Sequence, residues 1–129
     1  MTRPQLVQWF KYVSALTAVL VLFQAFLAGR FLFAGSDLLR EHEITANIVF
    51  LSALIQTGLL LGTGLQGPLR SRLLILNGLL LLFVVVQIGL GYSDSGTATA
   101  WHVTNGVFVF GLACFNLALA AQLPRSSAA

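Results

Sequence analysis

The amino-acid sequence predicts an all-α integral membrane protein that folds as an up-down bundle of four helices. Apolar residues make up 57% of the chain and charged residues only 9%, whereas a soluble domain carries roughly 25% charged residues. The mean hydropathy is +0.89. Four apolar stretches of about 20 residues are each long enough to cross roughly 30 Å of hydrocarbon as a helix. Residues 1–129 are therefore expected to form a single transmembrane domain.

The four expected helices follow one another with short connections. Ser36 is a favourable N-cap for the second helix, and Pro124 ends the fourth. The connections contain Gly, Pro, Ser and Asp residues that are typical of turns. Such short connections allow only antiparallel neighbours, so successive helices alternate in direction. The expected helices cover residues 12–33, 37–64, 69–92 and 97–123.

The first apolar segment has a second interpretation, as a cleavable signal peptide. Arg3 and Lys11 would form its charged region and residues 13–28 its apolar core. That core is longer than the roughly 7 to 15 residues typical of a signal peptide, and no small-x-small cleavage site precedes a polar start. Gln24 also interrupts it. A retained transmembrane helix is the favoured interpretation.

Charged residues divide unevenly between the two sides of the expected bundle. One side holds Arg3, Lys11, Arg70, Arg72 and Arg125 and no acidic residue. The other side holds Arg30, Arg40, Asp37, Glu41, Glu43 and Asp94. The positive-inside rule then places both termini in the cytoplasm and the protein in the inner cell membrane. Trp9 and Trp101 fall near the two interfaces, where indole rings prefer to lie.

The net charge of +3 does not indicate a nucleic-acid partner. The seven Arg and Lys residues are scattered singly and form no basic stripe with interleaved aromatic residues. The expected surroundings are the lipid bilayer, with a larger membrane complex as a further candidate partner. The single cysteine, Cys114, lies in an apolar run, so neither an intramolecular disulfide nor a cysteine-based metal site is expected.

The chain contains two similar helix pairs, each with one of its only two histidines. Placing His42 on His102 aligns identical residues at four further positions. Upstream, residues 24–28 resemble residues 87–91, with a connection three residues longer in the first half. The identical pairs are Val49 with Val109, Phe50 with Phe110, Ala53 with Ala113 and Leu59 with Leu119, and the near-matches are Ala46 with Gly106 and Gln56 with Asn116. The sequence therefore favours a repeat of two helices.

The two histidines predict a haem site. They lie near the outer ends of the second and fourth expected helices, which run in the same direction, so they lie at equal depth. In a square bundle these helices are diagonal, with axes roughly 11 to 14 Å apart when neighbouring axes are about 8 to 10 Å apart. Two imidazoles facing each other, each about 2 Å from a shared iron, need about that separation. His42 and His102 are thus the expected axial ligands of a b-type haem, in a protein of electron transfer or haem handling.

Residues around the histidines suit a flat macrocycle. Small residues one turn after each histidine would let a ring lie against the helix backbone. Phenylalanines could pack on its faces or edges, and two arginines could pair with its propionates. The residues expected in these roles are Ala46 and Gly106, Phe50 and Phe110, and Arg30 and Arg40.

A cofactor-free interpretation accounts for the same residues. A stripe of small residues is commonly helix packing in lipid, and arginines near helix ends extend toward headgroups. The chain would then be a structural subunit of a larger respiratory or photosynthetic complex. In a variant of this hypothesis each histidine binds a chlorophyll-type pigment. A five-coordinate magnesium needs only one imidazole, so the histidines would not need to face each other.

The helix count, the orientation and the placement of His42 and His102 resemble one half of a haem A synthase, over nearly the whole chain. In that family, the second and fourth helices of a four-helix half carry paired haem-ligating histidines at the outer side. The His-x3-small pattern is also similar to that of small uncharacterised bacterial four-helix membrane proteins. The resemblance implies that His42 and His102 are axial ligands.

The sequence departs from the synthases where their oxidation chemistry is concerned. Haem A synthases share a Glu-x-x-His-Arg stretch whose glutamate is implicated in oxidising the haem methyl group. Here Leu39 occupies the glutamate position and Glu43 the arginine position. Glu41 is adjacent to His42 and would point about 100° away from it on a helix. The cysteine pair that many such enzymes carry outside the membrane is absent, so the chain is not expected to be an enzyme.

Overall fold

A computed structural model describes residues 1–34, 37–93 and 95–124. It contains four helices, α1 (Arg3–Ala34), α2 (Leu39–Gly62), α3 (Pro68–Gly91) and α4 (Gly96–Ala121), and no strand within the described residues. All four helices are long and apolar enough to cross a membrane. The predicted all-α, four-helix architecture is confirmed, and it fits a multi-pass membrane protein.

The first helix is longer than predicted at its N-terminal end. It begins at Arg3, whereas the hydropathy pattern places its start near Tyr12, because hydropathy marks the apolar part of a helix and the preceding turns carry Arg3, Gln5, Gln8 and Lys11. Pro4 lies in that first turn, where a residue without an N–H is tolerated. The backbone N–H of Thr2 donates to Oε1 of Gln5 at 2.8 Å, which supplies a local cap for the helix start.

The starts of α2 and α4 are capped differently. Ser95 precedes α4 and its side chain accepts a hydrogen bond from the backbone N–H of Ala98 at 3.1 Å. Leu38 precedes α2 and provides no side-chain cap. The predicted cap of α2, Ser36, lies outside the described residues. An N-cap side chain typically stabilises a helix by about 1 kcal/mol, so the first turn of α2 is held less firmly than that of α4.

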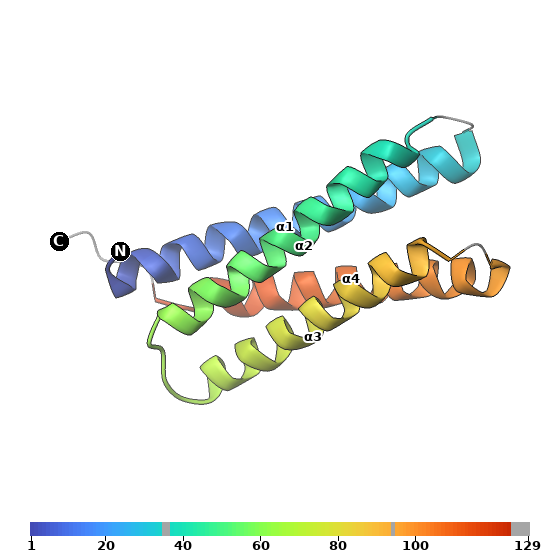
Figure 1. Cartoon of the computed structure of the whole chain (residues 1–129). Coiled ribbons are helices and arrows are strands. Elements are labelled where there is room, and N and C mark those ends of the chain that lie inside the picture. The colour runs from blue at the N-terminus through green and yellow to red at the C-terminus, as the bar shows by residue number, and fades with distance from the viewer. Residues whose placement is uncertain (35–36, 94, 125–129) are drawn as a thin grey trace.

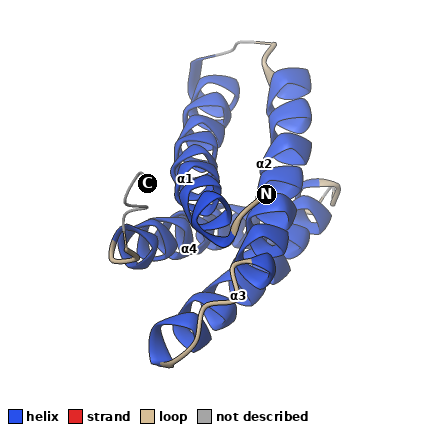
Figure 2. Cartoon of the chain, turned by 90° about the vertical axis from the view of Figure 1, so that its left-hand side faces the viewer, coloured by secondary structure: helices blue, strands red, loops and turns tan. Residues whose placement is uncertain are grey.

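The helices form two antiparallel hairpins, α1–α2 and α3–α4, that pack against each other (Figure 1). Helix α1 contacts α2 and α4, and α3 contacts α4 and α2. Figure 2 shows this order from the end of the bundle. At the end that holds the N-terminus, the Lys11 ammonium donates to the carbonyl oxygen of Leu123 at 2.6 Å, placing a positive charge at the C-terminus of α4. Because α2 and α4 do not contact each other directly, they occupy a diagonal of the bundle, as predicted.

The burial pattern supports the two-helix repeat. From Asp37 to Thr63, each residue has the same burial class as the residue sixty positions later, except for Leu51 and Gly111. The buried residues of α3 each follow a buried residue of α1 by 63 positions: Leu73 after Phe10, Asn77 after Ser14, Leu80 after Thr17, and Val84 after Val21. Each hairpin therefore presents an equivalent face to the other.

The connection between α1 and α2 is no longer than the connection between α3 and α4, contrary to the expectation from the repeat. Four residues separate α1 from α2 and four separate α3 from α4, because the gaps cover residues 35–38 and 92–95. The additional length lies in α1, which continues as a helix through Ala34. The prediction of a longer loop was wrong because an apolar segment with no proline remains helical past the level where α3 ends.

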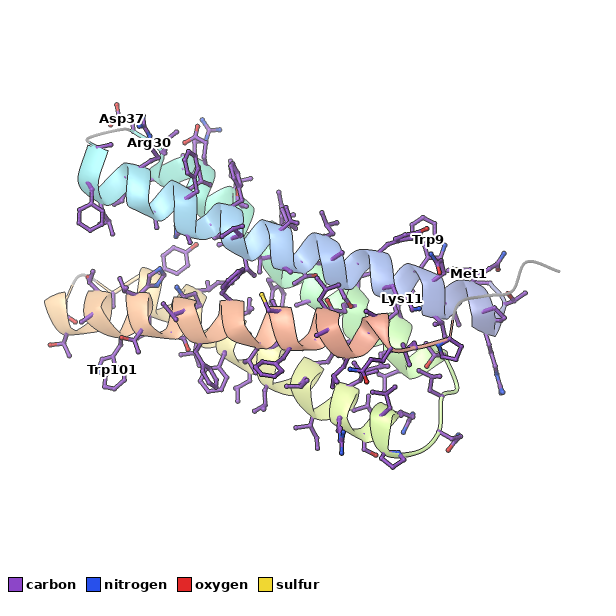
Figure 3. All side chains as sticks on the ribbon, turned by 180° about the vertical axis from the view of Figure 1, so that it is seen from behind. Met1, Trp9, Lys11, Arg30, Asp37 and Trp101 are labelled. Carbon is purple, nitrogen blue, oxygen red and sulfur yellow. The ribbon has the colours of Figure 1, made fainter. Side chains whose placement is uncertain are left out.

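The outer surface of the bundle is apolar along most of its length. Exposed large side chains include Phe26, Leu51, Ile75 and Phe115, and a soluble monomer rarely exposes apolar area on this scale. Trp9 and Trp101 project from opposite ends of the molecule (Figure 3), as predicted for two interfacial belts. This surface suits a lipid environment.

Two buried apolar clusters fill the middle of the bundle and the end that holds the N-terminus. The central cluster consists of Ala18, Val21, Val49, Ala53, Leu80, Val84, Val109, Leu112 and Ala113. The end cluster consists of Phe10, Leu60, Leu73, Ala120 and Leu123. At the opposite end, the side chains that meet between the hairpins are polar, and these form the candidate site.

A buried amide triad joins three of the helices between the central cluster and the end cluster. Gln56 of α2 donates through Nε2 to Oδ1 of Asn77 at 2.8 Å, and Asn77 of α3 donates to Oδ1 of Asn116 of α4 at 3.0 Å. Asn77 also donates to the carbonyl oxygen of Leu73 at 2.7 Å. The three side chains are at most 1% exposed. The repeat-equivalent residues Gln56 and Asn116 thus meet at one asparagine on α3.

Candidate functional site

One polar residue from each helix lies at the same level, near the N-terminal ends of α2 and α4. We call Gln24, His42, Gln87 and His102 the His–Gln layer. The Gln24 side chain of α1 donates to the main-chain oxygen of His42 at 2.7 Å. In the other hairpin, Nδ1 of His102 donates to the main-chain oxygen of Gln87 at 3.0 Å. Each histidine is therefore held by the glutamine of its own hairpin.

The two imidazole rings face each other across the diagonal of the bundle. Their centroids are 6.0 Å apart and their planes are inclined by 55°. Among the described residues the backbones of α2 and α4 are not in contact, and the two imidazole side chains reach across this diagonal. Two imidazoles that bind one metal from opposite sides, each through a bond of about 2 Å, have centroids about 6 Å apart. The pair thus has the spacing that shared axial coordination requires.

The orientation of the His102 ring is fixed by two features of α3. A main-chain carbonyl can only accept, so Nδ1 of His102 carries the proton and Nε2 is left with a lone pair. Gly91 provides the space for the ring, because a Cβ at this position would lie 3.1 Å from Cε1 of His102. The imidazole consequently lies against the backbone of α3, and among the described contacts Nε2 has no hydrogen-bond partner.

The environment of His42 differs from that of His102. Its Nδ1 is buried and has no hydrogen-bond partner among the residues that the structure describes. The Gln24 amide bonds to the main chain of His42 and not to its ring. His42 also lies in the first turn of α2, which begins at Leu39, whereas α4 begins six residues before His102, at Gly96.

The small residues predicted to flank a macrocycle have different neighbours. Ala46 is half-buried, one turn after His42. Gly106 faces α3, where a Cβ would lie 3.2 Å from Nε2 of Gln87. The structure therefore gives a packing reason for the glycine, and its role toward a macrocycle stays a prediction. The Gln87 side chain accepts a hydrogen bond from Asn105 at 2.6 Å, so it is itself held in place.

The other predicted site residues lie around the pair without joining it. Phe50 and Phe110 are half-buried and pack on the central cluster. Arg30 and Arg40 are exposed, and Figure 3 shows Arg30 at the same end of the molecule as Trp101, the neighbour of His102 in the sequence. Within the described contacts neither arginine bonds to the histidines, so their pairing with propionates stays a prediction. Glu41 and Glu43 are also exposed.

The sequence pattern assigned no site role to Gln24 and Gln87, which the structure places in contact with the histidines. The signal was present in the repeat, because these two glutamines occupy equivalent positions in the two halves. Their hydropathy alone gives no indication of a partner. The alignment of Gln24 with Gln87 and of His42 with His102 would have placed one glutamine beside each histidine.

The fold and the site define a class of protein, a four-helix bundle of membrane-spanning length with a facing histidine pair on diagonal helices. No family model, no curated protein and no solved structure matches the chain.

Proposed function

We propose that this protein is a membrane haem protein that holds one b-type haem between His42 and His102. The observation that carries this proposal is the 6.0 Å separation of the two ring centroids, about the spacing of two imidazoles on one metal. A pigment with five-coordinate magnesium would not require the rings to face each other. The facing pair therefore favours haem over two separate pigments.

The number of protein ligands also favours a macrocycle over a bare metal ion. In the part of the chain that the structure describes, no three His, Cys, Asp or Glu side chains lie together in a group that could hold a metal ion. Zinc sites normally take three or four protein ligands, which two imidazoles do not provide. A porphyrin supplies four nitrogens in a plane and needs only two axial side chains.

The two histidines and the residues around them have distinct roles in this proposal. His102 presents Nε2 in a fixed orientation, because its Nδ1 is bonded to α3. His42 presents its ring from the opposite side. Arg30 and Arg40 provide positive charge for propionates at the same end, and Phe50 and Phe110 provide apolar area below the ring. A bis-histidine haem supplies one-electron transfer when bound, so we propose electron transfer or haem handling and no catalysed reaction.

The absorption spectrum of the purified protein tests this proposal. After expression with haem supply and detergent extraction, the reduced protein should show the sharp α band of a low-spin b-type cytochrome, with one haem per chain. Substitution of either histidine by alanine should remove the low-spin spectrum. A colourless protein under the same conditions would contradict the proposal and support a cofactor-free structural subunit of a larger complex. A magnesium-pigment spectrum would support the pigment hypothesis.

We further propose that the protein lies in the inner cell membrane with both termini in the cytoplasm. The connection 63–67 and the start of α1 lie at one end of the bundle, together with Arg3, Arg70 and Arg72. The histidines lie toward the other end, where the acidic residues Asp37, Glu41 and Glu43 lie. The excess of positive charge on one side supports this orientation.

Cysteine labelling on intact cells tests the orientation. In a Cys114→Ala background, Ser93→Cys should react with an impermeant maleimide, while Gln66→Cys should react only after the cells are opened. Both positions are exposed and lie in connections at opposite ends. The reverse labelling pattern would invert the topology and move the histidine pair to the cytoplasmic side.

A further inference from the structure

The two histidines are bonded differently by the glutamine of their own hairpin: one glutamine uses its main chain and the other its side chain. In the second half, the main chain of Gln87 accepts a hydrogen bond from the imidazole of His102. In the first half, the side chain of Gln24 donates to the main chain of His42. Gln24 and Gln87 occupy equivalent positions on α1 and α3, and the three additional residues of the first half lie after Gln24, where α1 continues through Ala34. The difference therefore lies in the local side-chain contacts, and within the described residues Nδ1 of His42 has no hydrogen-bond partner.

A hydrogen bond at the second ring nitrogen strengthens a histidine ligand. It fixes the tautomer and the ring orientation and raises the basicity of the coordinating nitrogen. His102 has this bond, and Gly91 lets its ring lie against α3. The buried Nδ1 of His42 has no partner, and a buried polar group without a partner favours any movement that lets it find one.

The helix starts reinforce the same asymmetry. His42 lies in the first turn of α2, which has no side-chain cap. His102 lies a turn deeper in α4, whose start is capped by Ser95. Helix ends open at lower free energy than helix interiors. Both the ring and the backbone of His42 are therefore easier to displace than those of His102.

We propose, on the basis of the haem site proposed above, that His102 is the permanent axial ligand and His42 the exchangeable one. Displacement of His42 opens one coordination position, on the α2 side of the iron. In the reduced protein this position takes a neutral diatomic ligand of the class of carbon monoxide, nitric oxide or dioxygen. The protein would then bind a small gaseous ligand in addition to transferring electrons.

Matched histidine variants of the holoprotein test the asymmetry. His42→Ala should retain haem in a five-coordinate, high-spin form, and His102→Ala should retain at least tenfold less. Free imidazole should restore the low-spin spectrum of His42→Ala. Equal haem retention by the two variants, or better retention by His102→Ala, would overturn the assignment. If the wild type binds haem but His102→Ala retains as much haem as His42→Ala or more, only the difference between the two histidines is contradicted. A colourless wild type would contradict the haem site itself.

Carbon monoxide provides a second measurement that does not depend on the stability of the His102 variant. The reduced wild type should bind carbon monoxide, and its adduct should have the same absorption spectrum as the adduct of His42→Ala, because His102 is the opposite ligand in both. A reduced wild type that keeps its bis-histidine spectrum under saturating carbon monoxide would overturn the exchangeable position. An adduct spectrum that differs from that of His42→Ala would do the same.

Discussion

Replacement of Asn77 by leucine is expected to destabilise the bundle by about 2 kcal/mol. Asn77 accepts from Gln56 and donates to Asn116, at 2.8 and 3.0 Å. Leucine has the same branched shape, although it is larger, and it makes neither bond, so it leaves two buried amides without their interhelical partner. An unmade buried hydrogen bond is more costly than a made one is favourable. The free energy of unfolding in mixed micelles, followed by helical circular dichroism during SDS titration, measures the loss.

Two further variants separate lost hydrogen bonds from a change of side-chain size. The triple variant with leucine at Gln56, Asn77 and Asn116 removes every polar group of the triad, and it should unfold within about 1 kcal/mol of the wild type. Asn47→Leu is the control for the substitution itself, because Asn47 is exposed and bonds only within its own helix. A triple variant less stable than Asn77→Leu would contradict this account of the triad.

Gly91→Val is expected to weaken haem binding by about 10- to 100-fold, the usual effect of removing a partner that orients a metal ligand. A Cβ at Gly91 would lie 3.1 Å from Cε1 and 3.4 Å from Nδ1 of His102. The ring would have to shift away from α3, and the valine methyl groups add to this displacement, which weakens the bond of Nδ1 to the carbonyl of Gln87. Haem titration of the apoprotein, followed at the Soret band, measures the affinity.

Gly89→Val is a matched control on the same turn of α3. A Cβ at Gly89 would meet no atom within 4 Å, while the change in helix propensity is the same. The control should keep the affinity of the wild type, and both variants should insert equally well because valine is favourable in lipid. Equal affinity of the two variants would show that Gly91 does not position His102.

The sequence alone determined the membrane class, the number of helices and their alternating direction. Hydropathy and turn residues are sufficient for this, because every backbone polar group in lipid must bond within its own helix. The placement of His42 and His102 on diagonal helices followed from the same reasoning, since short connections leave one order of neighbours. The start of α1 did not follow, because the residues from Arg3 to Lys11 include polar and charged side chains that hydropathy excludes from a membrane span.

Only the tertiary structure decided what holds each histidine. Gln24 and Gln87 are equivalent in the repeat, yet one bonds through its side chain and the other through its main chain. The difference lies in the side-chain contacts that each histidine makes with its neighbouring helix, and these have no signature in hydropathy. The close approach of the Gln87 side chain to Gly106 is likewise visible only in the packed structure. Periodicity identifies which side chains face inward, and only the packed neighbours determine which atoms they meet.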